Sequence, residues 1–557
     1  MARISRQTKK PTHPKYIFVV GGVMSSVGKG IVAASVGRIL IDKGFSVTAL
    51  KIDPYINVDA GTMNPTEHGE VFVTNDGDET DQDIGNYERF LNTDILSTNY
   101  MTTGRVYLSV IEKERALEYK GKCVQVVPHI PIEIIRRIEE AQKNANADVV
   151  VIEIGGTVGE YENILFIEAL RLLKSKIPHD VITAMVSYLP IPSKVGEMKT
   201  KPTQHAVRTL NSTGIFPDFL FCRAAQTLDA VRKEKLSLFC NIKPDNIIAA
   251  PDVDSIYDIP ANFEKQKLGD RLCKELGLIP KKKKTSSPWT SFTQKLGRAN
   301  GTVSIAVVGK YFETGEFVLS DSYLSVIEAI KYSAYAQGKK PVLTWVNALD
   351  FERDPKTLKS LSVFDGILVP GGFGARGVEG KLKAIEYART HAIPYFGLCY
   401  GMQLAVIEYA RNVLGWKDAT TREINSNSKH IMIDIMDSQR ENLKKAHYGG
   451  SMRLGAYPAV LADGTHARKA YGTKTISERH RHRYEVNPVF IPDLKTKGLV
   501  FSGMSPDGNL AEIVELPSSV HPFFVATQFH PEFKARPLDP HPLFSAFIKA
   551  AISHKKM

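Results

Sequence analysis

The sequence predicts an α/β protein of two domains, each with a mainly parallel sheet. Segments 16–20 (YIFVV) and 303–308 (VSIAVV) each have the character of an opening strand, because each is a short β-branched apolar run followed by glycine. Between them lies a charged, Ser/Thr-rich stretch without clear periodicity, which is typical of a linker. We therefore expect domains at 1–280 and 301–557, joined by a linker at 281–300.

Further buried strands are expected among helical stretches in both halves. The candidates are 47–52, 148–154, 181–189, 219–222 and 246–249 in the first half, and 341–345, 366–369 and 395–398 in the second. Strands that alternate with helices form parallel sheets, and such sheets bind their ligands at the carboxyl ends of the strands. Functional residues are therefore expected where these strands end.

The first of these strand ends opens a glycine-rich segment, 21–30 (GGVMSSVGKG), before a helix expected at 31–40. A turn of this kind presents backbone N–H groups and Lys29 adds a cation, so it suits a nucleotide triphosphate. A standard P-loop has glycine where Val23 stands and a hydroxyl residue where Gly30 stands. Because that hydroxyl is missing, Mg²⁺ needs ligands from elsewhere.

Two groups of carboxylates are candidates for those ligands. The stretch 76–85 (DGDETDQDIG) gathers acidic residues in a turn-like setting, and Glu153 ends the strand VVVIE. Oxygen ligands of this kind around a triphosphate suit Mg²⁺. Taken alone, each is more often a solvated surface feature, but the neighbouring glycine-rich loop favours the functional interpretation.

A third segment of the first half, 199–205 (KTKPTQH), carries two lysines around a threonine, followed by Gln204. The lysines would clamp a second polyphosphate, and the amide would bind a base or ribose. As a bare motif this signal is weak, because most such lysines are only solvated.

A nucleophile is expected in the second half, where the strand 395–398 leads through Cys399 into a helix expected at 404–411. A cysteine at such a turn has an exposed sulfur, and the helix dipole stabilises its thiolate. Near the end of the chain, His530 and Glu532 would lie on the same side of an extended segment. The glutamate would then orient the imidazole that takes the thiol proton.

Two further segments bear on this site. The glycine N–H groups of 370–377 (PGGFGARG) and the N–H of Tyr400 would form an oxyanion hole. These elements together predict acyl transfer through a thioester. The stretch 478–486 (ERHRHRYEV) lacks the wider basic and aromatic field of a nucleic-acid surface, so we interpret it as an arginine directed at a carboxylate.

Composition and charge limit the class of protein. The 557 residues are 43% hydrophobic and 24% charged, the balance of a folded globular protein. The net charge of +12 favours anionic partners, although the basic head 1–10 and the lysine run 281–284 are typical of solvated tails and linkers.

Five widely spaced cysteines without a CxxC pair argue against a disulfide framework or a zinc site. The sequence also lacks a signal-peptide core and a membrane-spanning stretch. We therefore expect a cytoplasmic protein with neither a membrane nor a nucleic acid as partner.

In combination, these motifs resemble the CTP synthase family, in which a synthetase domain is fused to a class I glutamine amidotransferase domain. The resemblance covers nearly the whole chain. The matching stretches are GGVMSSVGKG, KIDPYINVDAGTMNPTEHGEVFV, DGDETDQDIGNYERF, VIEIGGTVGE, GEMKTKPTQH, DVDSIYDIP, PGGFGARGVEG, GLCYGMQLA, ERHRHRYEVN and QFHPEF.

The resemblance implies a P-loop-like (dethiobiotin-synthetase-like) first domain and a flavodoxin-like glutaminase domain. In this family, which carries out the final step of de novo CTP synthesis, ATP phosphorylates the 4-oxygen of UTP. Ammonia from glutamine hydrolysis then passes through an internal channel and displaces the phosphate, which gives CTP. The resemblance also implies Mg²⁺, GTP as allosteric activator, CTP as feedback inhibitor, a homotetramer and, in some members, filaments.

Carried over position by position, the resemblance implies four sets of site residues. Those for ATP are Ser26, Val27, Gly28, Lys29, Gly30, Ile31, Lys51, Asp83, Asp252 and Val253, with Asp83 and Glu153 as Mg²⁺ ligands. Those for UTP and CTP are Ser25, Glu160, Tyr161, Glu162, Lys199, Thr200, Lys201, Pro202, Thr203, Gln204 and Lys235. Those for glutamine are Gly372, Phe373, Tyr400, Gly401, Met402, Gln403, Glu423 and Arg483. The catalytic residues are Cys399, His530 and Glu532.

Three positions depart from the family pattern. Tyr400 stands where leucine or isoleucine is usual, and only its backbone N–H is needed. Glu423 lies in TTREI where the family has STEF, and Glu160 replaces an aspartate and is one methylene longer.

Two other functions share some of these motifs. An ATP-dependent amidotransferase acting on a carboxylate would use the same two modules, but KTKPTQH and PYINVDAGTMNP argue against it. A filament protein that has lost catalysis is disfavoured because the catalytic, phosphate-binding and metal-binding residues are all present.

Overall fold

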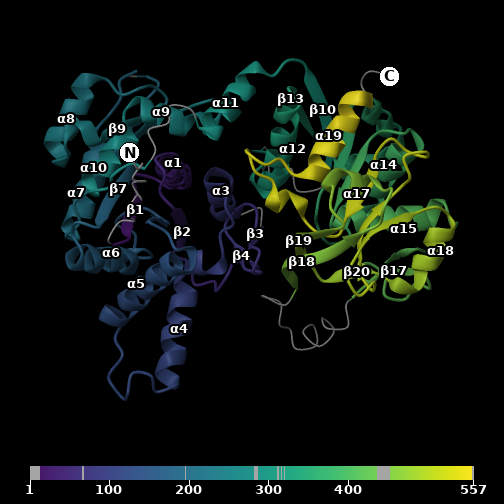
Figure 1. Cartoon of the computed structure of the whole chain (residues 1–557), viewed down its shortest axis with the longest axis horizontal. Coiled ribbons are helices and arrows are strands. Elements are labelled where there is room, and N and C mark those ends of the chain that lie inside the picture. Colours follow the sequence, from purple (N-terminus) through teal and green to yellow (C-terminus); the bar gives the residue numbers. More distant parts are fainter. Residues whose placement is uncertain are drawn as a thin grey trace, which may run out of the picture. The chain divides into compact units, whose positions relative to one another are not determined.

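The computed structural model of the chain describes residues 13–64, 68–194, 196–281, 287–309, 313–314, 317–318, 320–435 and 452–554. The basic head 1–10 and most of the lysine run 281–284 lie outside the described residues. The chain divides into two compact units, drawn in Figure 1. The N-terminal unit comprises Met1–Asp59 and Asp83–Thr293, and the C-terminal unit comprises Ala60–Gln82 and Gln294–Met557.

The N-terminal unit is built on a sheet of seven parallel strands in the order β5-β2-β6-β1-β7-β8-β9. The strands are β1 Lys15–Gly22, β2 Val47–Asp53, β5 Tyr100–Thr102, β6 Val149–Ile154, β7 Val181–Tyr188, β8 Phe219–Ala224 and β9 Ile247–Pro251. The helices are α1 Lys29–Asp42, α3 Gln82–Leu91, α4 Thr103–Arg115, α5 Val126–Ala145, α6 Ile164–Lys176, α7 Lys201–Ser212, α8 Ala230–Cys240, α9 Ile259–Lys265 and α10 Leu268–Glu275. The strand expected at 16–20 and the five strands expected after it in the first half are thus confirmed.

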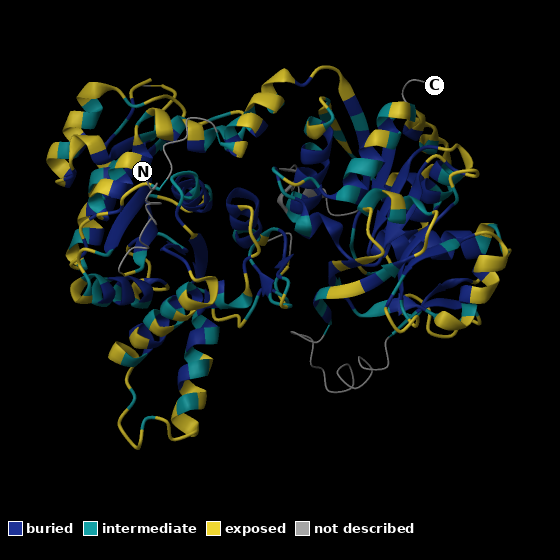
Figure 2. Ribbon diagram, viewed as in Figure 1, coloured by how far each residue is buried: buried dark blue, intermediate teal, exposed yellow. Residues whose placement is uncertain are grey.

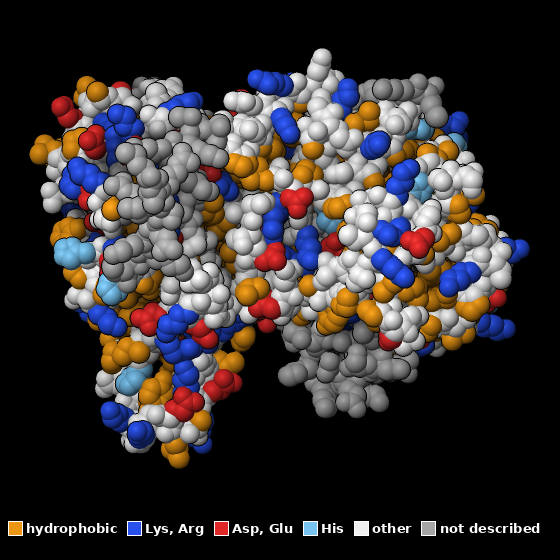
Figure 3. All heavy atoms as spheres, in the orientation of Figure 1, with side chains coloured by type: hydrophobic (Ala, Val, Ile, Leu, Met, Phe, Trp, Pro, Cys, Tyr) orange, Lys and Arg blue, Asp and Glu red, His pale blue; other side chains and the backbone are white. Residues whose placement is uncertain are grey.

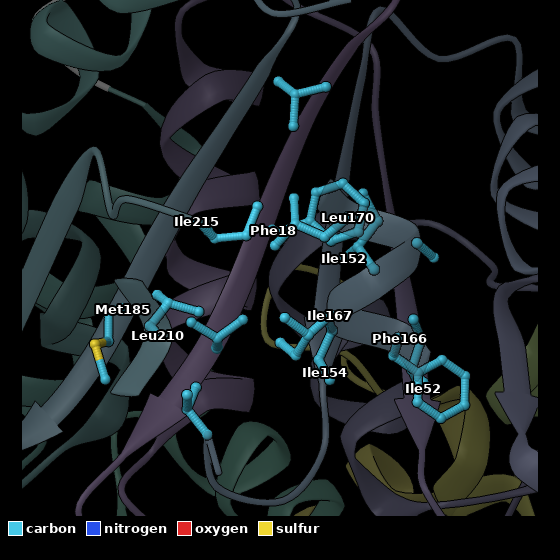
Figure 4. Close-up of a cluster of buried hydrophobic side chains, with 14 of the residues drawn as sticks. Phe18, Ile52, Ile152, Ile154, Phe166, Ile167, Leu170, Met185, Leu210 and Ile215 are labelled. Atoms are coloured by element: carbon cyan, nitrogen blue, oxygen red, sulfur yellow. The ribbon is translucent and has the colours of Figure 1, made fainter. Parts of the chain in front are cut away.

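The core of this unit lies on both faces of the sheet. Alternate residues of β1 point to opposite faces, and Phe18 joins a buried cluster with side chains of α5, α6 and α7. Figure 4 shows this cluster, with Ile152 and Leu170 beside Phe18. Helix α1 packs on the opposite face against β1, β2 and β6. In Figure 2 the strands are dark blue, whereas α4, α5 and α8 carry exposed outer faces.

The strand register brings two functional candidates to the same level. Glu153 of β6 is the pairing partner of Val19 on one side and of Lys51 on the other. Because all seven strands are parallel, their carboxyl ends meet at one edge of the sheet, where the glycine-rich loop also begins.

The C-terminal unit is built on a sheet of nine strands in the order β13-β10-β14-β15-β23-β22-β21-β18-β19. The first five strands are parallel and the remaining pairs are antiparallel. They are β10 Thr302–Gly309, β13 Lys340–Asn347, β14 Gly366–Val369, β15 Tyr395–Leu398, β18 Arg453–Leu461, β19 Thr475–His482, β21 Val500–Met504, β22 Ala511–Glu515 and β23 Phe524–Thr527. The parallel strands expected in the second half are confirmed.

Smaller strands and the helices complete this unit. The short strands are β3 Phe72–Val73, β4 Glu79–Thr80, β11 Glu313–Thr314, β12 Phe317–Val318, β16 Thr420–Thr421, β17 Ile431–Ile435 and β20 Tyr484–Val486. The helices are α12 Leu324–Ala336, α13 Ala348–Arg353, α14 Val378–Thr390, α15 Tyr400–Asn412, α17 His466–Tyr471, α18 Ile491–Thr496 and α19 Pro542–His554.

The segment Ala60–Gln82 belongs to the C-terminal unit, although it lies within the range 1–280 expected for the first domain. Phe72 stacks edge-on against Phe533, with ring centroids 5.2 Å apart. Arg479 donates to the Val73 carbonyl (3.0 Å) and to Asn75 Oδ1 (2.6 Å). The backbone N–H of Ser325 donates to the buried carboxylate of Glu70. These contacts join residues far apart in the sequence, so the order of motifs along the chain does not predict them.

The expected linker 281–300 contains a helix, α11 Pro288–Arg298. Its first turns bury Trp289 and Phe292, and Trp289 Nε1 donates to the Tyr257 carbonyl (2.9 Å). The Trp289 ring also packs on Phe90, with centroids 4.9 Å apart. Aromatic packing therefore orders a stretch whose composition alone is that of a linker.

The surface shows no single basic field on the face drawn in Figure 3, where Lys and Arg side chains are interspersed with Asp and Glu. Among the helices of the described ranges, none combines the length and apolarity needed to cross a membrane.

Candidate functional sites

The glycine-rich loop joins β1 to α1 as the sequence predicts. Val23, Ser26 and Gly28 have positive φ angles of 78°, 54° and 94°. These angles turn the chain sharply into α1 and place Lys29 at its first position. Lys29 is buried, and its Nζ donates to the Gly156 carbonyl at the end of β6 (2.8 Å).

Lys51 lies at the centre of a buried charged cluster beside this loop. Its Nζ is hydrogen-bonded to Asp83, lies 3.2 Å from Glu153 Oε1 and lies 3.6 Å from Asp53 Oδ1. Tyr87 donates its hydroxyl to the other oxygen of Glu153. The strand ends of β2 and β6 and the first turn of α3 thus bring together the predicted Lys51, Asp83 and Glu153.

Asp83 occupies the space beside Gly30, because a Cβ at Gly30 would overlap the Asp83 carboxylate. Gly30 is the position at which a standard P-loop carries a hydroxyl residue. A carboxylate from α3 therefore lies where the loop itself lacks an oxygen ligand. The acidic stretch that was expected to be turn-like in fact contains the short strand β4 and the start of α3, which fixes this carboxylate.

Burial and neighbouring charges shift the acidities of the cluster in different directions. Burial raises the pKa of Glu153, and the Asp83 charge raises it further. Burial also acts on Asp83, but the Lys51 ammonium outweighs it and lowers the Asp83 pKa. Burial lowers the pKa of Lys29 from its ordinary value, against the opposing charge of Glu153.

The cluster fits a magnesium ion by the chemistry of its donors. Asp83 and Glu153 supply carboxylate oxygens that converge on a single cationic group, the Lys51 ammonium. Hard oxygen donors next to a phosphate-binding loop are what Mg²⁺ prefers. The two residues would hold the ion, and its charge would offset that of bound phosphates.

A pocket of about 210 Å³ opens beside the same loop in the N-terminal unit. It is lined by Val27, Gly28, Ile31, Asp252 and Val253, all among the predicted ATP residues. Arg223, which sequence reasoning missed, also lines it and donates to the Ser26 carbonyl and to Asp252 Oδ1 (both 3.1 Å).

The predicted UTP residues 199–204 lie at the start of α7 and Lys235 lies on α8, whereas Ser25 lies before α1 and residues 160–162 lie between β6 and α6. Glu197 pairs with Lys199 and Arg232, and Lys235 also acts on its charge, so these cations surround one carboxylate. Thr200 Oγ1 accepts from Gln204 Nε2 (3.1 Å), and buried Thr203 bonds Ser187 (2.7 Å).

The other residues of this set divide by exposure. Lys201, Lys235, Ser25, Tyr161 and Glu162 are exposed. Glu160, also exposed, accepts from the backbone N–H of Thr157 (2.8 Å). Thr200 and Thr203 are thus fixed within the fold, whereas the charged members remain accessible to an anionic ligand.

The predicted nucleophile lies on a strained turn. Cys399 has φ 48° and ψ −96°, between β15 and the first residue of α15. A non-glycine residue in such a conformation persists only when its surroundings impose it, and such residues cluster at active sites. Here Gly401 packs so closely on the Val369 backbone that no side chain would fit.

The imidazole and carboxylate stand next to this thiol. His530 Nδ1 lies 2.7 Å from Glu532 Oε1, which leaves Nε2 for the thiol. Burial lowers the His530 pKa, but the charges of Glu532 and Cys399 outweigh it and raise that pKa to about 10. Residues 531–534 form a 3-10 turn, so the expectation of an extended segment is wrong, although the predicted contact forms.

A cavity of about 620 Å³ surrounds the thiol within the C-terminal unit. Gly372, Phe373, Tyr400, Gln403, Glu423 and Arg483 of the predicted glutamine set line it. Gly374 connects two of them, since its N–H donates to Glu423 Oε1 and its carbonyl accepts from the Tyr400 hydroxyl (both 2.9 Å).

The predicted oxyanion-hole segment is close to the triad. A Cβ at Gly371 would lie 2.9 Å from His530 Cε1, so glycine allows the ring to approach this loop. Gly401 and Met402 belong to the buried start of α15. In the stretch 478–486, where an arginine directed at a carboxylate was expected, Arg481 Nε lies 2.8 Å from Glu79 Oε1.

Sequence reasoning missed several residues of these sites. Gln528 donates to Cys399 Sγ (3.7 Å). The segment Ala60–Gln82, called the inserted segment below, lines the cavity with Gly61, Thr62, Glu70 and Val71. Two missed residues had a signal. Arg223 is a charged residue next to the carboxyl end of a buried strand, and Tyr87 follows Asp83 by one helical turn.

Comparisons with known proteins agree along the chain. Residues 15–278 match the family model "CTP synthase N-terminus", and residues 318–550 match "Glutamine amidotransferase class-I". A protein named CTP synthase from Carboxydothermus hydrogenoformans is 49% identical over 544 residues, which is 98% of this chain and 99% of that protein. A CTP synthase from Methanocaldococcus jannaschii is 47% identical over 97% of this chain and 99% of that protein.

Among solved structures, the Trypanosoma brucei CTPS glutaminase domain with bound acivicin is 40% identical. It covers 45% of this chain and 94% of that one, with a TM-score of 0.42.

Proposed function

Because the chain belongs to the CTP synthase family, a family of ligases (EC 6.3.4.2), we propose that it aminates UTP to CTP through two linked sites. The observation that carries this proposal is that each unit brings together reactive groups of the kind that one of the two steps needs. The N-terminal unit has a phosphate loop with a lysine and two carboxylates, and the C-terminal unit has a thiol, an imidazole and a carboxylate.

In the proposed glutaminase step, the Cys399 thiolate attacks the carboxamide carbon of glutamine. The backbone N–H of Tyr400 stabilises the oxyanion, and His530 donates its proton to the departing ammonia. Water then hydrolyses the thioester to glutamate. The raised pKa of His530 supports this role, because the imidazole stays protonated in the resting enzyme.

In the proposed synthetase step, the γ-phosphoryl group of ATP passes to the 4-oxygen of UTP, and ammonia displaces it as phosphate. Lys29 and the loop N–H groups bind the ATP phosphates. Lys199, Lys201 and Lys235 bind the UTP phosphates, and Asp83 and Glu153 hold Mg²⁺. Ammonia passes internally from one site to the other.

We extend the proposal to regulation and assembly by family membership. GTP activates glutamine hydrolysis, CTP inhibits by competing with UTP, and the active form is a cytoplasmic homotetramer that forms filaments in some members. Light scattering with and without ATP and UTP tests the tetramer.

The activity itself is tested by following the conversion of UTP by absorbance with ATP and Mg²⁺. Glutamine and ammonia are compared as nitrogen sources, each with GTP or CTP added. CTP formation from both sources supports the proposal. Formation from neither, by folded protein, refutes it.

A further inference from the structure

The C-terminal unit contains a cluster of buried polar side chains that do not belong to the triad of Cys399, His530 and Glu532. Its members come from four strands of the C-terminal unit, and each is at most 5% exposed: Arg453, His480, His482, Glu485 and Glu512. Arg453 lies between the two carboxylates, 2.7 Å from Glu512 Oε1 and 3.1 Å from Glu485 Oε1. Burying so many polar groups is costly, and a role in positioning would account for it.

The cluster meets the cavity around the thiol at His482, which lines it, and at the backbone carbonyl of Tyr484. The carbonyl oxygen of Tyr484 accepts from Gln403 Nε2 (3.0 Å) and lies 3.2 Å from His482 Nδ1. Gln403 Nε2 also lies 3.4 Å from Gln528 Oε1, and Gln528 Nε2 donates to Cys399 Sγ. Hydrogen bonds therefore connect His482 to the side chains around the thiol.

The hydrogen-bond chain fixes which ring nitrogens carry protons. A carbonyl oxygen only accepts, so His482 carries a proton on Nδ1. Burial, together with the charge of Arg453 and of His530, lowers the His482 pKa well below its ordinary value, so the ring is neutral and Nε2 is an acceptor. His480 Nδ1, which lies 2.8 Å from that Nε2, must then be the donor.

Glu512 lies on the other side of His480. Burial, His482, Arg453 and His530 hold the His480 pKa well below its ordinary value, so His480 Nε2 is an acceptor. It lies 3.4 Å from Glu512 Oε2. Glu512 Oε2 makes no hydrogen bond to this nitrogen, so the chain of donors does not extend to Glu512. Donors run in one direction, from His480 through His482 to the Tyr484 carbonyl.

We propose that His482 is a positioning residue for glutamine, held in one tautomer by His480 and the Tyr484 carbonyl. Its Nδ1–H and the Gln403 amide share the Tyr484 carbonyl, and this arrangement sets the direction of the Gln403 side chain. Gln403 Nε2 is engaged by two acceptors, so Oε1 is the atom that faces a substrate N–H. The inference rests on the proposed function, because it assumes that Gln403 binds glutamine.

Two substitutions at His482 separate hydrogen bonding from packing. In His482→Asn the amide nitrogen takes the place of Nδ1 and keeps the bond to Tyr484. In His482→Gln the longer side chain places its amide near Nε2, so the bond to Tyr484 is lost. In the full chain we expect His482→Gln to raise the KM for glutamine about tenfold with kcat within about threefold. We expect His482→Asn to stay within about threefold of the unsubstituted KM.

Equal KM values in the two variants, whether raised or unchanged, would overturn the inference. Thermal unfolding establishes that each variant is folded. If His482→Gln does not fold, His480→Asn and His480→Gln replace the pair, because only the asparagine amide takes the place of Nδ1 and keeps a donor toward His482. A glutamine KM raised only in His480→Gln supports the donor chain, and equal KM values overturn it.

Gln403→Ala distinguishes failure of the inference from failure of the proposed function. A raised glutamine KM in Gln403→Ala, with no difference between the two His482 variants, overturns the inference alone. An unchanged KM in Gln403→Ala overturns the assignment of Gln403 to glutamine.

Discussion

The Nδ1 atom of His530 lies 2.7 Å from Oε1 of Glu532, and both side chains are buried beside Cys399. The Phe533 ring stacks on the imidazole, with centroids 5.1 Å apart and planes 18° from parallel. The carboxylate and the stacked ring together fix the orientation of the imidazole. This pair therefore determines both the charge and the direction of the group that faces the thiol.

Glu532→Gln should narrow the pH range of glutamine hydrolysis. Removing the carboxylate lowers the His530 pKa from about 10, so the imidazolium is lost at lower pH. The alkaline limb of kcat/KM for glutamine should move down by about one to three pH units. An unchanged limb would mean that Glu532 does not set the His530 charge.

The same pair makes stability depend on pH. The pKa of folded His530 is about 10 and its ordinary value is 6.5. The contribution to the free energy of unfolding is therefore fully present below about pH 6.5 and is lost as the pH rises through about 10. The difference in Tm between Glu532→Gln and the unsubstituted chain should shrink over that range. A difference that stays constant contradicts this linkage.

Lys29→Ala should block CTP formation from glutamine and from ammonia alike, because both routes need ATP phosphates at the loop. We expect a loss of at least about a hundredfold in each rate. Lys274→Ala, at an exposed position of α10, is the matched control and should leave both rates unchanged. Substantial ammonia-dependent turnover in Lys29→Ala would contradict the assignment of Lys29 to the ATP phosphates.

Gly30→Ala tests the contact between the loop and Asp83. The added methyl group would displace the carboxylate, so both routes to CTP should slow by about tenfold or more and need more Mg²⁺. Gly297→Ala, where a Cβ meets nothing within 4 Å, is the control. Equal Mg²⁺ dependence in the two variants counts against the metal site.

Phe72→Ala tests how the inserted segment is attached. The ring is buried against Phe533, which in turn stacks on His530. Its loss should cost about 3–5 kcal/mol in the free energy of unfolding of the C-terminal unit and weaken glutamine hydrolysis. Val520→Ala, at a position 67% exposed, should change neither. Unaltered unfolding of Phe72→Ala in denaturant would show that the segment is not packed as described.

Local patterns in the sequence predicted the strands, the phosphate loop and the triad, because β-branched runs and glycine-rich turns carry their own conformational preference. The contact of Asp83 with Gly30 was not predictable, since it depends on where α3 packs. Strand pairing also decides which groups the side chains of 478–486 contact. His480 and His482 point to a buried cluster, whereas Arg481 points to Glu79.

The boundary between the units could not be predicted from the order of motifs along the chain either. Phe72 and Glu70 are held by side chains and backbone from the far end of the sequence. Such long-range contacts follow from tertiary packing alone, so the inserted segment was assigned to the first domain by its position.

The central claim is that the triad only supplies ammonia, and Cys399→Ala tests it most directly. Glutamine-dependent CTP formation is measured beside ammonia-dependent formation, with Cys123→Ala, at an exposed cysteine, as control. The glutamine-dependent rate should fall by at least about a thousandfold, while the ammonia-dependent rate stays within about twofold. Loss of both rates in folded Cys399→Ala would contradict this division of labour.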